Sequence, residues 1–141
     1  MKYNSIDSER AVVGGLLLEP SVDKILLTRL TPEDFSDDKL SYIFTSILEM
    51  VKKKISVDAV TVRDYIDLER QPNDRPWAVN FEDLALLLEN SIGSTNIQSY
   101  ARHIRECRIK NAVEDLKKDI DYENYQETVS QIQNLELELE D

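Results

Sequence analysis

Glycine and proline are scarce in this chain of 141 residues, which contains three glycines and four prolines. Because tight β-turns rely on these two residues, the chain has too few of them for the many turns of an all-β fold. Long apolar runs are missing too. None approaches the ~18 residues of a membrane-spanning helix, and the opening segment MKYNSIDSER lacks the apolar core of a signal peptide. We therefore expect a soluble, cytoplasmic protein with no membrane contact.

Cysteine and histidine occur once each, as Cys107 and His103. A single cysteine excludes an internal disulfide, which fits a reducing compartment, and a lone histidine without a cysteine cluster argues against a zinc site. The two residues are four apart and can share a helix face, but a nucleophile also needs a pocket and an oriented base. We interpret His103 as a helix-surface residue and expect no metal and no catalytic residue.

Phosphate-binding motifs are also missing. Neither G-x-x-x-x-G-K-[ST] nor G-x-G-x-x-G occurs, so no loop in these residues would cradle a nucleoside triphosphate. Adjacent carboxylates at 33–34 and 37–38 lie at predicted helix starts, where capping and the helix dipole explain them without catalysis. We expect no cofactor.

Acidic residues outnumber basic ones by 28 to 17, which gives a formal net charge of −11. Binding to phosphates needs clustered Lys and Arg, so we expect basic protein partners rather than direct nucleic-acid contact. The basic residues concentrate on one predicted helix, which carries Arg102, Arg105, Arg108, Lys110, Lys117 and Lys118. The simplest interpretation is a solvated helix face. The alternative is a docking strip for an acidic partner, or for the acidic tail of another copy, with Arg102, Arg105 and Arg108 as its candidate residues.

Apolar residues recur every three to four positions along most of the chain, which is typical of amphipathic helices. We predict an all-α fold with helices over about residues 7–19, 22–30, 38–53, 56–69, 80–93, 95–119 and 125–135. The β-branched residues at 57–62 leave a short strand as an alternative there. Residues 70–80 contain two prolines and are predicted to form a loop, and the closing LELELED is expected to fray.

Packing in the first part of the chain is expected to depend on two glycines and three apolar anchors. Gly14 and Gly15 lie inside the first helix, where each costs about 1 kcal/mol relative to alanine. Either another backbone packs closely against them, or a well-buried helix tolerates them. The segment TPED offers a helix start that leads into Phe35, and Ile43 and Phe44 follow on the apolar face of the next helix.

The stretch STNIQSYARHIRE, residues 94–106, opens a long helix, and Thr95 or Asn96 is its predicted cap. A short connection, DIDYENY, leads to a last amphipathic helix, and two adjacent helices with a short link lie antiparallel. We therefore expect a compact helical head over residues 1–93 followed by an antiparallel helical hairpin over 94–141. The apolar stripes of the hairpin are candidates for self-association: Ile97, Tyr100, Ile104, Val129, Ile132 and Leu135.

Four segments follow one another in a characteristic order: SERAVVGGLLLEP, LTPEDFSDDKLSYIF, VDAVTV and STNIQSYARHIRE. Together they resemble, over roughly residues 8–113, the N-terminal domain of DnaB-type replicative hexameric DNA helicases. That family has a double glycine in its opening helix, an Asp-Phe pair before a helix with Ile-Phe, a Val-Asp-x-Val-Thr element and a run of the type Asn-Ile-x-x-Tyr-Ala. The chain departs from the pattern at Ser36 and Leu40, where the family usually has tyrosine and histidine, and at AVNFEDL. These departures suggest a divergent, phage- or prophage-derived member.

The resemblance implies a helical head and a hairpin, hairpins that pair between subunits, and a collar of six copies that docks primase and, in some systems, a helicase loader. It also implies a motor domain with a P-loop, so that a longer parent would be an ATP-dependent DNA helicase and this chain its non-catalytic assembly and docking module. Two alternatives stay open. One is a free-standing regulator that binds a host helicase or its loader and inhibits or redirects it. The other is an all-α dimerisation domain unrelated to replication.

Overall fold

The computed structural model describes residues 2–70, 75–91, 96–121 and 123–140. These residues form a 3₁₀ turn, η1 (Pro32–Asp34), and the α-helices α1 (Ile6–Leu18), α2 (Val22–Thr28), α3 (Asp38–Lys52), α4 (Ala59–Glu69), α5 (Phe81–Glu89), α6 (Ile97–Lys118) and α7 (Tyr125–Leu139). No strand occurs in the described ranges, so the all-α prediction is confirmed. The strand alternative at 57–62 is wrong, because α4 begins there behind a capping box of Asp58 and Thr61.

Side-chain caps set several of the helix starts. The Asp37 carboxylate accepts a hydrogen bond from the Leu40 N–H at 2.9 Å, and the Asn80 amide oxygen accepts from the Asp83 N–H at 3.0 Å. Asn96 forms no side-chain cap for α6, and Thr95, the other predicted cap, lies outside the described residues, as do 71–74 of the predicted loop. Most helix starts were therefore predictable from the sequence, because a capping side chain bonds a backbone N–H only a few residues away.

Helix ends differ more from expectation. Helix α2 stops at Thr28 rather than at residue 30, because Arg29 adopts a left-handed conformation with a φ of 55°. The predicted fraying of the carboxyl end is wrong, since α7 continues to Leu139. There, apolar side chains of α7 pack on α6, and this tertiary contact extends the helix beyond its expected end.

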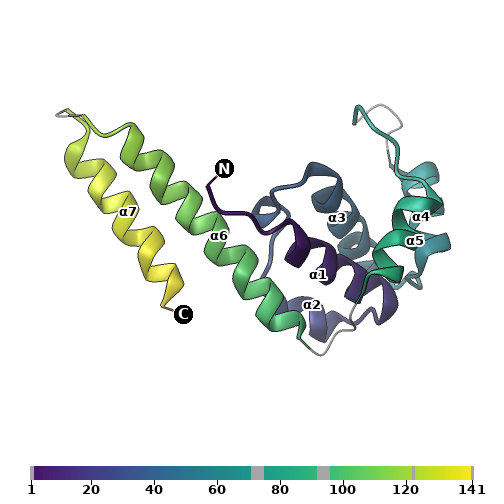
Figure 1. The fold of residues 1–141 in the computed structure, drawn as a ribbon. Helices are drawn as coiled ribbons and strands as arrows, with labels where there is room; N and C mark the ends of the chain where they lie inside the picture. The colour runs from purple at the N-terminus through teal and green to yellow at the C-terminus, as the bar shows by residue number, and fades with distance from the viewer. Residues whose placement is uncertain (1, 71–74, 92–95, 122, 141) are drawn as a thin grey trace.

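Helix α1 lies at the centre of the head and packs against α3, α5 and α6 (Figure 1). Phe35, Ile43 and Phe44 lie in the core that these helices share, and the rings of Phe35 and Phe44 are 4.8 Å apart between centroids. Gly14 allows the backbones of α1 and α5 to approach, because a Cβ at this position would lie only 2.5 Å from the Leu87 carbonyl oxygen. Close backbone packing, the first of the two interpretations, therefore accounts for Gly14.

Glu9 is a fully buried carboxylate that ties α1 to the segment before α3. It accepts hydrogen bonds from the Ser5 hydroxyl at 2.7 Å, from the Ser36 N–H at 2.9 Å and hydroxyl at 2.5 Å, and from the Asp37 N–H at 3.1 Å. Buried polar groups are tolerated only where hydrogen-bonding partners compensate for the lost water. Ser36, one of the positions that departs from the family pattern, is thus a partner of this carboxylate.

The second half of α6 extends away from the head and forms an antiparallel hairpin with α7 (Figure 1). Ile109, Val113 and Ile132 form its buried seam, which is separate from the head core. The amino end of the chain runs alongside α6, where the Asn111 side chain bonds both the N–H and the carbonyl of Tyr3 at 3.0 Å. No helix in the described ranges is long and apolar enough to cross a membrane.

Candidate docking and assembly surfaces

Helix α6 belongs to two apolar clusters along its length. Its first half contributes Ile97, Ala101 and Ile104 to the head core, whereas its second half contributes Ile109 and Val113 to the hairpin seam. The helix therefore joins the head to the hairpin as one continuous rod of 22 residues.

The structure distributes the six predicted self-association residues over different environments. Ile97 and Ile104 are 4% and 0% exposed and contact the chain's own head, so for these two the expectation of an interface stripe is corrected. Helical spacing shows that a stripe is apolar, but it does not show which neighbour covers it. Tyr100 is half-buried against the head core. In α7, Ile132 is buried in the hairpin seam, Leu135 packs beside it and Val129 is half-buried. Contact of these residues with a second chain stays a prediction.

The three predicted docking arginines also differ from one another. Arg102 is exposed and pairs with Glu106 at 3.0 Å. Arg108 is engaged within the chain, because its Nε lies 2.5 Å from the nearly buried Asp34 carboxylate and its Nη2 lies 2.8 Å from Glu138. Arg108 thus holds η1, α6 and α7 together. Contact between Arg108 and a partner would require breaking these pairs, so Arg102 and Arg105 are the better candidates.

Arg105 points from α6 towards the end of α2, where it donates a hydrogen bond to the Thr28 carbonyl. Arginine at this place satisfies a free carbonyl of the last helical turn. Burial, together with the charge of the nearby Arg29, lowers the pKa of the Arg105 guanidinium. Because these surroundings disfavour the charged guanidinium, a further negative charge beside it would stabilise it.

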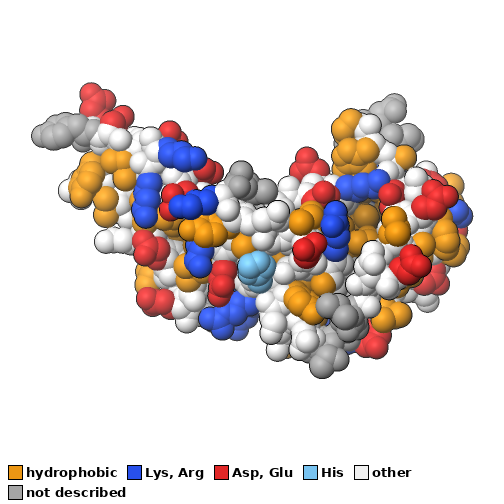
Figure 2. Space-filling model, viewed as in Figure 1, with side chains coloured by type: hydrophobic (Ala, Val, Ile, Leu, Met, Phe, Trp, Pro, Cys, Tyr) orange, Lys and Arg blue, Asp and Glu red, His pale blue; other side chains and the backbone are white. Residues whose placement is uncertain are grey.

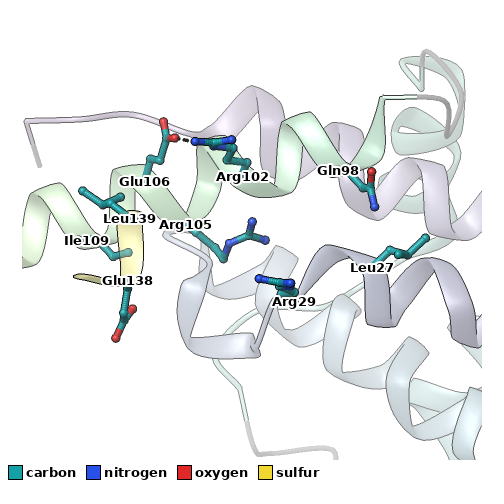
Figure 3. A pocket seen from close by; sticks show the side chains of 9 residues that line it. All are labelled: Leu27, Arg29, Gln98, Arg102, Arg105, Glu106, Ile109, Glu138 and Leu139. Carbon is teal, nitrogen blue, oxygen red and sulfur yellow. Dashed lines mark hydrogen bonds and ion pairs between the residues drawn. The ribbon is translucent and has the colours of Figure 1, made fainter. Parts of the chain in front are cut away.

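Arg29, which sequence reasoning missed, completes a groove of about 380 Å³ between α2 and α6. Figure 3 shows Arg29 and Arg105 extending towards each other inside it. The groove is lined by Leu27, Arg29, Gln98, Arg102, Arg105, Glu106, Ile109, Glu138 and Leu139. The sequence carried a signal for an exposed apolar surface here, because the short helix α2 has more apolar residues than one buried stripe can contain. Val22 and Leu26 on this helix are 53% and 68% exposed.

Chemical catalysis finds little support in the described residues. The Cys107 Sγ lies 3.6 Å from the His103 Nε2, but Cys107 is buried and this burial raises the pKa of its thiol, which disfavours the thiolate. No group of three or more potential metal-ligating side chains was found in the described part of the chain. On the face seen in Figure 2, Lys and Arg side chains are interspersed with Asp and Glu.

An all-helical head joined by one long helix to a projecting hairpin defines the class of a two-part helical domain in the described residues. Residues 1–106 match the family model described as the DnaB-like helicase N terminal domain, and the chain belongs to this family.

Curated relatives agree with this family. The replicative DNA helicase DnaB of Rhodothermus marinus is 28% identical over 110 residues, which cover 78% of this chain and 11% of the relative. The replicative DNA helicase DnaB of Buchnera aphidicola is 25% identical over 103 residues, covering 73% of this chain and 22% of the relative. The chain thus corresponds to a small part of the length of these helicases.

Solved structures share the fold. The crystal structure of the N-terminal domain of the DnaB helicase from Mycobacterium tuberculosis superposes with a TM-score of 0.66 at 23% identity, over 92% of this chain and 94% of that one. A DnaB-like replicative helicase, described with its interactions with primase, superposes with a TM-score of 0.68 at 22% identity, over 95% of this chain and 31% of that one. At these identities the likeness shows the fold alone.

Proposed function

We propose that the chain is the non-catalytic N-terminal assembly and docking module of a replicative DNA helicase. In this proposal residues 1–93 form the head, which binds the primase or a helicase loader, and residues 94–141 form the hairpin, which pairs with a second copy. Family membership and the relatives named as replicative helicases support the replication context. The structural neighbour that was described together with primase supports docking of that partner.

The small core of the projecting hairpin is the single observation that carries the assembly role. Among the described residues, the buried members of its apolar cluster are Ile109, Val113 and Ile132, with Leu116, Leu135 and Leu139 partly buried against them. Paired helices derive most of their stability from packing of their apolar faces, so a seam of this size leaves the hairpin dependent on further contacts. Tyr125 and Leu137 remain more than half exposed on α7. A second hairpin could cover such residues, and a lasting contact would bury on the order of 1,000 Å² or more.

The test is the solution mass of the purified chain over a range of concentrations, by light scattering after gel filtration. We expect a dimer or larger assembly that dissociates on dilution, and we expect Val129→Asp to shift it towards the monomer. Val129 suits this test because it is half-buried on α7 and is not part of the buried seam. Leu68→Asp is the matched control, since Leu68 is 82% exposed on α4 of the head. A monomer at every concentration would contradict the assembly role.

A second measurement addresses docking. A purified primase is added to the chain and complex formation is followed by the same method. We expect the mass to rise, and we expect Val129→Asp to keep this binding, because the proposed docking surface lies on the head. Failure of the primase to bind would contradict docking of primase while leaving the assembly role intact.

A further inference from the structure

The described residues neutralise the positive charge of the groove between α2 and α6 only in part. Arg102 has only an exposed pair with Glu106, and such pairs contribute little. The guanidinium groups of Arg29 and Arg105 form no ion pair with a carboxylate anywhere in the described ranges. In a chain of net charge −11, three arginines that converge on one groove therefore form a local site for negative charge.

The same groove has an apolar border. Leu27 lines it and is 54% exposed, and Leu26 and Val22 are exposed beside it on α2. On the α6 side, Gln98, Arg102 and Ile109 line the groove at a spacing that places them on one helix face. This face spans about 16 Å along α6, at about 1.5 Å per residue, which is the length of about three helical turns.

One end of this groove is already occupied by an acidic helix of the chain itself. The carboxyl end of α7 places Leu139 at the groove, and Glu138 binds Arg108 at 2.8 Å. Within one molecule, a leucine and a glutamate of α7 therefore already lie against this part of α6. The part of the groove nearer to Gln98, with Arg29 and Arg102, has no such occupant in the described structure.

We infer that the groove between α2 and α6 is a docking site for an acidic, leucine-bearing helix of a partner protein. Carboxylates of that helix would bind the guanidinium groups of Arg29 and Arg102, which favour paired hydrogen bonds to carboxylates. Its leucine would pack on Leu27, as amphipathic helices pack into grooves. A nucleic-acid strand fits less well, because Glu106 and Glu138 line the same groove and would repel phosphates.

This inference deepens the proposed docking role by placing a docking site where the head meets the hairpin, and it rests on that role only for the identity of the partner. The groove is formed by α2, α6 and the end of α7, and its chemistry does not depend on pairing of hairpins. Failure of the assembly role and failure of the docking site can therefore be observed separately.

The experiment measures binding of a fluorescent, alanine-based helical peptide of about four turns that carries leucine and glutamate on one face. We expect saturable binding to the full chain that weakens as salt rises. The double variant Arg29→Gln/Arg102→Gln should weaken it by about tenfold or more, since desolvated charge pairs govern such contacts. Leu27→Ser should also weaken it. Arg63→Gln and Leu68→Ser on α4 are the matched controls, and circular dichroism verifies that every variant is folded.

Several results would overturn the inference. These are failure of the wild-type chain to bind the peptide, equal binding of a peptide with glutamine in place of glutamate, and unchanged binding in the double variant. Binding of a single-stranded oligonucleotide that the double variant abolishes would assign the groove to nucleic acid instead. If the double variant abolished self-association, the occupant would be another copy of this chain. Retained peptide binding by Val129→Asp would support the site independently of assembly.

Discussion

Replacing Gly14 with alanine tests the packing of α1 on α5, because that packing decides whether the change raises or lowers the free energy of unfolding. In a helix interior without a close neighbour, this change would stabilise the protein by about 1 kcal/mol. Here the added Cβ would lie 2.5 Å from the Leu87 carbonyl oxygen and 3.2 Å from its carbonyl carbon. Non-bonded heavy atoms prefer about 3.5 Å or more, so the helices would have to separate by up to about 1 Å.

The expected cost follows from what resists this separation. The clashing atoms belong to the backbone, so no side chain can rotate away from the Cβ. Leu84 and Leu87 are buried on α5, and Lys39 of α3 binds Asp83 at 2.7 Å, so α5 is held in place. Overpacking of this kind costs about 1–3 kcal/mol. With the gain in helix propensity subtracted, we expect the free energy of unfolding to fall by about 1 kcal/mol, and by no more than about 2 kcal/mol.

Urea denaturation followed by circular dichroism measures the change, and the urea midpoint should fall while the m-value stays constant. Ser8→Ala on the same helix is the control and should change the stability by no more than about 0.5 kcal/mol. An unchanged or higher stability of Gly14→Ala would refute the argument, because it would mean that α1 and α5 do not approach as closely as described.

Three further predictions use the same assay. Glu9→Ala should lower the free energy of unfolding by about 3 kcal/mol or more, because it leaves several buried donors unpaired. Ser36→Ala removes only one of these donors and should lower it by about 1 kcal/mol. Equal losses in the two variants would contradict this. Lys54→Gly should stabilise the protein by about 0.5–1 kcal/mol, because Lys54 follows the cap of α3 in a left-handed conformation with a φ of 60°; a loss of stability would refute it. Burial opposes ionisation of Asp83, but the hydrogen bonds from Lys39 and from the Asn80 N–H, together with the Lys39 charge, outweigh it and lower the pKa. The stability due to the Asp83 carboxylate is therefore present above the unfolded-state pKa of about 3.9 and is lost as pH falls through the lower folded-state pKa. The advantage of the wild type over Asp83→Asn should thus shrink below about pH 4, and a constant difference would contradict the assignment.

Sequence alone determined the local features of this protein. The all-α class, most helix starts and the antiparallel hairpin follow from apolar periodicity, caps and short links, which act between residues a few positions apart. The family was also accessible, because its motifs are short segments in a set order. Close backbone packing at Gly14 was one of two interpretations of the sequence, which did not show the helix that Gly14 contacts.

Only the tertiary structure decided which neighbour covers each apolar face and which charges meet. Ile97 and Ile104 form a helical stripe in any environment, but the packing of α6 on α1 assigns them to the head core rather than to an interface. The groove depends on Arg29 and Arg105, which are brought together from distant parts of the chain by the ending of α2 against α6. Periodicity and spacing carry no information on such pairs, because burial and electrostatics depend on distances in space rather than along the sequence.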